Sequence, residues 1–211
     1  MAVKPILFNT AMVRAILDGR KRQTRRIIKG LPLYEPYFEE DEGRGFLMES
    51  EDGQFYALEN FSKIHPGDVL YVRETWADIP ETAPGNLHYR ADATQADLDW
   101  FREKGWKWRP SIHMPKVAAR IFLRVTGVRC ERLRDISAKD AFSEGTGRLF
   151  LEDIAYGDKD YECDLDDEYG MAREQFAWLW ESTLRKNDLE RYGWWANPWV
   201  WVIEFERCEK P

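Results

Sequence analysis

The sequence has few of the side chains that hold metal ions or disulfide frameworks. Its 211 residues include three cysteines and three histidines, and none of them stands at the short spacing of a zinc knuckle or a metal-binding helix. The cysteines are Cys130, Cys163 and Cys208, and the histidines are His65, His88 and His113. An odd number of widely spaced cysteines argues against a disulfide framework. We therefore expect reduced thiols, no metal site and no cofactor.

Long apolar runs are also missing. No segment approaches the roughly 18 consecutive apolar residues that a membrane-spanning helix needs. The N-terminal residues lack the charged-then-apolar pattern of a secretory signal. We therefore expect a cytoplasmic protein without a membrane partner. No feature of the sequence indicates an oligomeric state.

Positive charge is in deficit overall but concentrated in one place. The formal net charge is -7, which disfavours general adhesion to polyanions and favours a small ligand over a long nucleic acid. Against this average, five of the eight residues from Gly19 to Arg26 are basic. Their local positive field suits a nucleotide or a nucleic acid. A solvated loop at a helix end, stabilised by the helix dipole, accounts for the same residues without a ligand.

The periodicity of apolar residues predicts one domain that mixes helices and strands. With 44% apolar residues, the chain can bury one sizeable core, and we expect a single domain over residues 1–211. Period-two alternation or apolar runs predict strands at 69–75, 118–129 and 199–205, and helical spacing predicts helices at 10–18, 137–144 and 171–186. Thr10 is the expected N-cap of the first helix and Gly19 its stop.

Three polar stretches interrupt this pattern and are expected to be insertions on the surface. They cover about residues 31–62, 77–108 and 146–170. The first contains a weak hairpin signal at Asp52-Gly53, the second a plausible helix at 93–104, and the third a strongly acidic run. Strands separated by short helices and long loops favour a small mixed barrel over a doubly wound sheet.

Four short motifs together resemble an ASCH domain. They are the helix that ends in Gly-Arg-Lys with Thr24 three residues after the lysine, the turn and strand Gly67-Asp68-Val69-Leu70, the short helix that ends at Glu144-Gly145, and the last strand, Val200 to Phe205. The resemblance implies an α+β fold with a PUA-like mixed β-barrel, short flanking helices and long insertions. The segments Tyr71 to Trp76 and Trp108 to Pro115 are similar to those of the larger, often prophage-encoded members.

The same resemblance implies an activity and a catalytic set. Small ASCH proteins include amidohydrolases that remove the acyl group from N(4)-acetylcytidine with a lysine, a threonine three residues later and a glutamate on the next short helix. These positions fall on Lys21, Thr24 and Glu144, which implies Thr24 as nucleophile, Lys21 as general base and Glu144 as the group that orients the lysine or handles water and the leaving amine. Other ASCH proteins are proposed to bind or cut RNA.

The chemistry of this set depends on the charge of the lysine. A threonine hydroxyl needs a base within hydrogen-bond reach, and a lysine accepts a proton only when its pKa falls by roughly three units from about 10.4. The neighbouring arginines lower the pKa by repulsion, whereas pairing with Glu144 raises it. A tight pair with Glu144 therefore favours a structural salt bridge or an anion clamp. In a regular strand Lys21 and Thr24 would face opposite sides, so an irregular backbone is predicted there.

A modified pyrimidine nucleoside or RNA is the expected partner, and its ring needs an aromatic surface and edge-reading donors. The candidates for substrate binding are Arg20, Arg26, Arg73, Trp76, Trp108, Ser111 and His113. Three functions stay open: an amidohydrolase, a non-catalytic RNA- or modified-base-binding module, and a ribonuclease. The ribonuclease ranks last, because neither paired histidines nor a set of metal-binding carboxylates is evident.

Overall fold

A computed structural model describes residues 1–28, 37–39, 45–49, 55–57, 62–79, 86–147 and 165–211. The strands are β1 (Val3–Leu7), β2 (Gln23–Ile27), β3 (Tyr37–Glu39), β4 (Gly45–Glu49), β5 (Phe55–Ala57), β6 (Val69–Arg73), β7 (Trp76–Asp78), β8 (Leu87–Tyr89), β9 (Phe122–Arg132) and β10 (Trp199–Cys208). The helices are α1 (Thr10–Leu17), α2 (Gln95–Glu103), α3 (Ala138–Ser143), α5 (Leu165–Ser182) and α6 (Leu189–Tyr192). This mixture confirms the α+β class.

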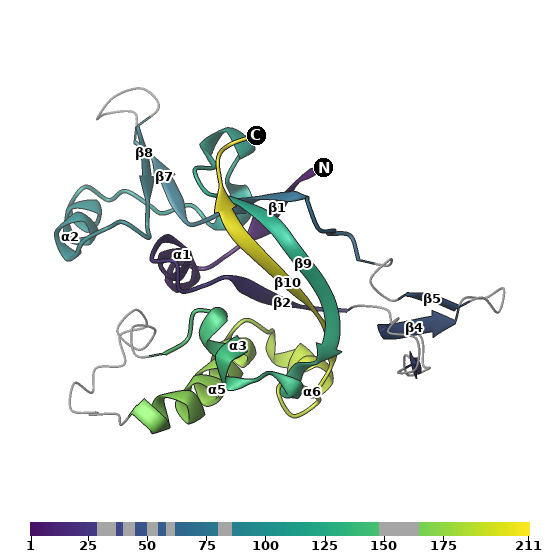
Figure 1. Cartoon of the computed structure of the whole chain (residues 1–211). Helices are drawn as coiled ribbons and strands as arrows, with labels where there is room; N and C mark the ends of the chain where they lie inside the picture. Colours follow the sequence, from purple (N-terminus) through teal and green to yellow (C-terminus); the bar gives the residue numbers. More distant parts are fainter. Residues whose placement is uncertain (29–36, 40–44, 50–54, 58–61, 80–85, 148–164) are drawn as a thin grey trace.

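A curled five-stranded sheet organises the molecule. Its strand order is β1-β6-β9-β10-β2, with β1 parallel to β6 and the other neighbours antiparallel. The long strands β9 and β10 curve together through the middle of the molecule (Figure 1). Strands β1 and β2 form the two edges, and within the described chain no backbone pairing joins them. The expected closed barrel therefore stays a prediction, and the sheet has a seam between β1 and β2.

A side chain spans this seam. The Arg26 Nη2 of β2 donates to the carbonyl oxygen of Leu7 in β1 at 2.9 Å. The two edges of the sheet therefore approach each other although they share no ladder of hydrogen bonds.

Helix α1 packs into the main core and leads the chain to β2. Its N-cap is Asn9, whose side chain accepts from the Met12 backbone N–H at 2.8 Å; the prediction of Thr10 was wrong, because Thr10 already lies inside the helix. Gly19 adopts a left-handed φ of +76° after the helix, as expected of a C-terminal stop. The helix buries Met12, Ala15 and Ile16.

Three apolar clusters include residues of the sheet, and two of them also include residues of α1, α3 or α5. The first joins α1 to the inner residues of the strands, including Leu70, Leu123 and Ile203. The second lies beneath α3 and α5, where Phe176 and Trp180 pack with residues of β10. Figure 1 shows α3, α5 and α6 gathered at one end of the sheet, next to β2 and β10.

The other predicted elements agree with the structure within a few residues or extend beyond their expected ranges. β6 and β9 carry the predicted buried positions, and the expected helix at 93–104 is α2. The helix expected at 171–186 begins earlier, at Leu165, and ends at Ser182. The first insertion contains the antiparallel sheet β3-β4-β5, and the second contains the β7-β8 pair, which we did not predict. The Asp52-Gly53 turn and most of the third insertion lie outside the described residues.

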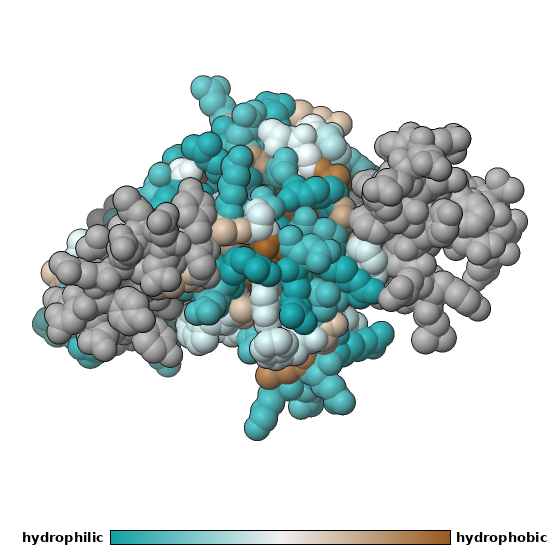
Figure 2. Space-filling view, turned by 60° about the horizontal axis from the view of Figure 1, so that its bottom comes forward, coloured by the Kyte–Doolittle hydropathy of each residue, from teal (hydrophilic) through white to brown (hydrophobic). Residues whose placement is uncertain are grey.

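Hydrophobic side chains are exposed at scattered places. The face in Figure 2 is mostly hydrophilic, with hydrophobic residues in small spots. The large exposed ones among the described residues are Met1, Leu7, Ile112, Val117, Trp178 and Trp195. Within the same residues, no helix is both long enough and apolar enough to cross a bilayer.

The Asp68 carboxylate anchors β1 beside β6 and generates a prediction. It accepts from the Ala2 N–H at 2.8 Å, the His65 N–H at 3.1 Å and Lys4 Nζ at 2.5 Å. Burial alone would raise the pKa of Asp68, but hydrogen bonds from Lys4 and the two backbone groups lower it to about 2.

We therefore expect Asp68→Asn to lower the free energy of unfolding at pH 7 by about 1–3 kcal/mol, the range for hydrogen bonds to a charged group. A carboxylate with a lowered pKa stabilises the fold above its unfolded pKa of about 4, and this contribution disappears as the pH falls towards 2. Urea unfolding of both proteins from pH 7 to pH 2 should show the difference between them shrinking below pH 4. A difference that stays constant over this range would contradict the assignment.

Candidate active site

Lys21 and Thr24 reach the same cavity because the chain between them is irregular. After Gly19, the Lys21 N–H donates to the carbonyl oxygen of Ala15 at 2.9 Å and the Arg22 N–H to that of Ser143 at 2.8 Å. Regular strand geometry begins only at residue 23. Lys21 thus precedes the strand and Thr24 lies within it, which confirms the predicted irregularity.

The carboxylate of Glu144 is brought to Lys21 by the C-terminal end of α3. Glu144 is the C-cap of this helix, and Gly145 follows with a φ of +93°. A Cβ on Gly145 would lie 2.8 Å from the Cβ of Ala15 and 3.2 Å from that of Lys21, so only glycine permits this approach. Gln23 Nε2 also donates to the carbonyl oxygen of Asp140 at 2.8 Å and ties β2 to α3.

Glu144 lies between two buried cations. Lys21 Nζ donates to Glu144 Oε2 at 2.7 Å and to the Glu144 carbonyl oxygen at 2.8 Å. Arg25 Nη1 donates to the other carboxylate oxygen, Oε1, at 3.0 Å. The exposed fractions of the three side chains are 2% for Lys21, 3% for Glu144 and 0% for Arg25. The carboxylate is therefore shared and shielded from water.

The balance of these forces lowers the pKa of Lys21 below its ordinary value. Burial is the largest cause, Glu144 opposes it by charge and hydrogen bond, and Arg26 and Arg25 add repulsion. Burial also lowers the pKa of Arg26, against the attraction of Glu144. Lys21 thus forms the tight pair with Glu144 that favours a charged lysine and an anion clamp. Burial and the two arginines nevertheless favour the neutral amine that a general base needs.

A small inner cavity adjoins these groups. Its volume is about 60 Å³. It is lined by Phe8, Met12, Lys21, Thr24, Arg25, Arg26, Glu144, Phe176, Leu179, Trp180 and Thr183. Because one water needs roughly 10–15 Å³ of such space, the inner cavity has room for a few waters or a short acyl group. It is too small for a nucleoside.

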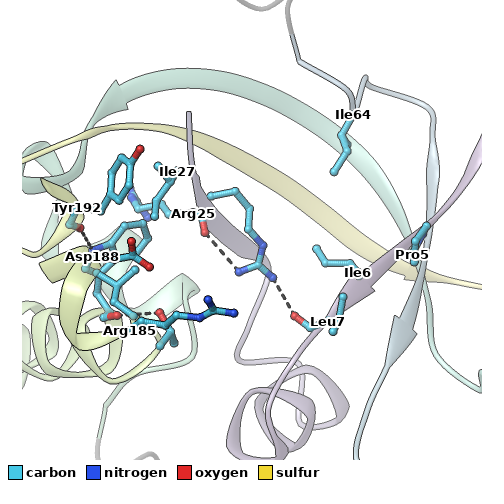
Figure 3. A pocket seen from close by; sticks show the side chains of 13 residues that line it. Pro5, Ile6, Leu7, Arg25, Ile27, Ile64, Arg185, Asp188 and Tyr192 are labelled. Carbon is cyan, nitrogen blue, oxygen red and sulfur yellow. Dashed lines mark hydrogen bonds between the residues drawn. The ribbon is translucent and has the colours of Figure 1, made fainter. Parts of the chain in front are cut away.

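A larger outer cavity of about 530 Å³ meets the inner one. Arg25, Arg26, Trp180 and Thr183 line both. Figure 3 shows its two walls: Pro5, Ile6, Leu7 and Ile64 on the β1 side, and Ile27, Arg185, Asp188 and Tyr192 on the other. The volume falls within the range of about 300–1,000 Å³ that is usual for small-molecule sites.

Hydrogen bonds hold the wall that the two cavities share. Trp180 Nε1 donates to the carbonyl oxygen of Tyr192 at 2.8 Å. The Arg26 guanidinium, besides its bond to Leu7, lies 5.2 Å from the centre of the Phe8 ring; the dashed line that ends at Leu7 in Figure 3 is that bond. Sequence reasoning assigned none of Trp180, Phe8 and Tyr192 to a site. The only signal for Trp180 was its helical spacing, which serves the core equally well.

Most of the predicted substrate-binding residues lie elsewhere. Neither the inner nor the outer cavity is lined by Arg20, Arg73, Trp76, Trp108, Ser111 or His113. Trp108 lines a separate cavity of about 160 Å³ instead, beside Phe101. Arg73 donates to the carbonyl oxygens of Met114, at 2.9 Å, and Ile112, and Arg20 Nη1 donates to that of Gly145 at 3.0 Å. Of the seven candidates, Arg26 lines the cavities.

The two tryptophans have structural surroundings of their own. Trp76 is buried in a separate apolar cluster that includes Met114 and Phe122. Trp108 stacks on Phe101 with ring centres 4.2 Å apart. Ser111 and His113 bound a short 3₁₀ turn, where His113 is exposed. Trp76 thus packs β7 against Val69 of β6 and Phe122 of β9.

Metal ligands do not gather in the part of the chain that the structure describes: no three His, Cys, Asp or Glu side chains stand close enough to hold an ion. Cys130 is buried and Cys208 half-buried, and Cys163 lies outside the described residues.

Comparison with known proteins places one solved structure beside this chain. No family model matches the sequence, and no curated protein matches it. The crystal structure of an ASCH domain from Lactobacillus crispatus is similar, with a TM-score of 0.35 and 12% identity, over 98% of this chain and 79% of that one.

Proposed function

We propose that this chain is an ASCH-type protein with a PUA-like fold that removes the acyl group from N(4)-acetylcytidine or a related acylated pyrimidine nucleoside. One observation carries the proposal: Lys21, Thr24 and Glu144, which match the catalytic positions of such hydrolases, line one inner cavity that meets a cavity of ligand size. The resemblance of the motifs supplies the family, and the juxtaposition of the three side chains supports the chemistry.

The reaction is an acyl transfer in two halves. Lys21 Nζ takes the proton of Thr24 Oγ1 as that oxygen attacks the amide carbon. The tetrahedral intermediate collapses when the C–N bond breaks and the lysine returns the proton to the departing N4 amine. Water, deprotonated by the same lysine, then attacks the threonine ester; the acyl C–Oγ1 bond breaks, the lysine returns the proton to Thr24 Oγ1, and the carboxylic acid is released. Glu144 holds Lys21 through Oε2 and the backbone carbonyl, so the amine keeps its place.

The two cavities suit the two parts of such a substrate. A two-carbon acyl group fits the inner cavity beside Thr24, where Phe8, Met12 and Leu179 offer apolar surface. The pyrimidine and its sugar fit the outer cavity, where Trp180 and Tyr192 offer ring surfaces and Arg26 and Arg185 offer donors. Arg26 lines both cavities, so it is the candidate donor for the oxyanion.

A non-catalytic module that binds RNA or a modified base is the second candidate. The Lys21 Nζ to Glu144 Oε2 distance of 2.7 Å favours it, because a tight pair stabilises the charged lysine. Binding of this kind weakens steeply with salt when phosphates are contacted, whereas hydrolysis of a neutral nucleoside does not. A ribonuclease stays third, since among the described residues no histidine lines the inner or the outer cavity, and His88 lines a separate one.

The first prediction concerns the nucleophile. We expect the purified protein to release cytidine from N(4)-acetylcytidine, and Thr24→Val to lose at least a hundredfold in kcat/KM, because the isosteric side chain has no hydroxyl. Thr24→Ser should keep measurable activity. Thr126→Val, the same isosteric change at an exposed position of β9 outside both cavities, is the matched control and should leave the rate unchanged. A Thr24→Val protein that folds normally and hydrolyses at the wild-type rate would refute the assignment.

The second prediction concerns the base. The lowered pKa of Lys21 means that the neutral amine appears at a lower pH than in a free lysine, so kcat/KM should rise with pH through a midpoint below 10.5. Lys21→Arg, which keeps the charge but cannot deprotonate, should abolish this rise and lower the rate about a hundred- to ten-thousandfold. A pH–rate profile of both proteins between pH 5 and 10 checks this. A wild-type profile that falls as the pH rises is the opposite result.

A further inference from the structure

Arg25 is the most enclosed charged side chain near the site, and the catalytic scheme leaves it without a role. Its side chain is 0% exposed. It donates through Nη1 to Glu144 Oε1 at 3.0 Å and through Nε to Glu131 Oε1 at 2.9 Å, and Nη2 also donates to Glu131. Asp140 Oδ2 lies 3.8 Å from Nη2. One guanidinium thus joins Glu144 to two further carboxylates.

The network continues from Arg25 to the surface of the sheet. Glu131 Oε2 accepts from Arg129 Nε at 3.3 Å, and Arg129 also pairs with Glu204 and Asp140. The sheet register explains this grouping, because Val202 of β10 pairs with Arg25 of β2 on one side and with Arg129 of β9 on the other. Exposure rises along the network from 0% at Arg25 through 16% at Glu131 to 38% at Arg129.

We infer that Arg25 is a positioning residue for the proposed hydrolysis: by holding Oε1 of Glu144 it leaves only Oε2 to Lys21, and it thereby keeps the amine free to take the proton of Thr24. An arginine remains protonated at any working pH. Its positive charge therefore always attracts the Glu144 carboxylate. This attraction weakens the stabilisation that Glu144 gives to the protonated Lys21. The inference rests on the proposed function for its catalytic consequence.

Other charges near Lys21 are few, so the effect of Arg25 can be isolated. The charged side chains that line the inner cavity with Lys21 are Arg25 and Arg26 from β2 and Glu144 from the end of α3. Met12 of α1 and the α5 residues Phe176, Leu179 and Trp180 bring no charge to it. Burial and Arg26 lower the pKa of Lys21 independently of Arg25. The repulsion that Arg25 adds is weakened by the Glu131 carboxylate, which pairs with Arg25.

Variants of Arg25 and Glu131 are predicted to shift the titration midpoint of Lys21 in opposite directions. Without the Glu131 charge, Arg25 is less neutralised and acts more strongly on Glu144 and Lys21. Arg25→Met should therefore raise the titration midpoint of Lys21 by about one pH unit or more, and Glu131→Gln should lower it. A purely structural role for Arg25 would not produce shifts in opposite directions.

The experiment follows the Lys21 side chain directly by NMR in protein with isotope-labelled lysine, without any substrate. Wild type, Arg25→Met, Glu131→Gln and Arg120→Met are titrated, the last as a matched control because Arg120 pairs with Glu74 and Asp92 outside both cavities. The expected result is an upward shift, a downward shift and no shift, respectively. If Arg25→Met does not fold, Glu131→Gln and the charge-conserving Arg25→Lys carry the test, with a raised midpoint expected for Arg25→Lys because it loses the guanidinium fork. An unchanged Lys21 midpoint in the variants that fold overturns the inference.

The pH dependence of kcat/KM for N(4)-acetylcytidine separates this inference from the proposed function. Its midpoint should move in the same direction as the Lys21 titration in each variant. If the titration shifts as expected while wild type shows no hydrolysis, the coupling of Arg25 to Lys21 is supported and the proposed hydrolase activity is the part that fails. If hydrolysis occurs and its pH profile is identical in all four proteins, the positioning role is overturned.

Discussion

The shared carboxylate of Glu144 is the interaction on which the centre of this structure depends. A buried anion is costly unless it is paired and hydrogen-bonded, and here Lys21 takes one oxygen while Arg25 takes the other. Removing either cation would leave one carboxylate oxygen away from water without its hydrogen-bond donor. The group that matters for the proposed chemistry is therefore also the group that joins α3 to the start of β2, so stability and reactivity are coupled at one carboxylate.

Strand β2 connects this pair to the rest of the fold. It is an edge strand, bonded to β10 on one side, and its other side faces the outer cavity. Because side chains alternate along a strand, Thr24 and Arg26 would normally share a face and Arg25 would point the other way. All three nevertheless line the inner cavity. This cavity lies where residues of α5 and the end of α3 cover β2.

Local features of the site were predictable from the sequence, and its assembly was not. The Lys-x-x-Thr spacing, the Gly19 stop and the end of a short helix at Glu144-Gly145 are local signals, and the structure brings these residues together. Arg26 could be singled out because the basic segment was conspicuous. By contrast, Trp108 stacks on Phe101 and Trp76 packs with Met114, and such tertiary choices leave no mark in the spacing of the residues. The role of Arg25 depends on Glu131, 106 residues away, and no pattern within a short window could indicate that pair.

The seam between β1 and β2 affects how the outer cavity, which both strands line, can change its width. A ladder of backbone hydrogen bonds would fix the separation of the two strands, but here an arginine side chain spans it through the Leu7 carbonyl. Widening the gap between β1 and β2 would therefore break no strand pairing among the described residues. A substitution of Arg26 alone would be enough to alter the width of the gap. A fold of this kind can adapt to bulkier or smaller ligands by single amino-acid changes while its central strands keep their register.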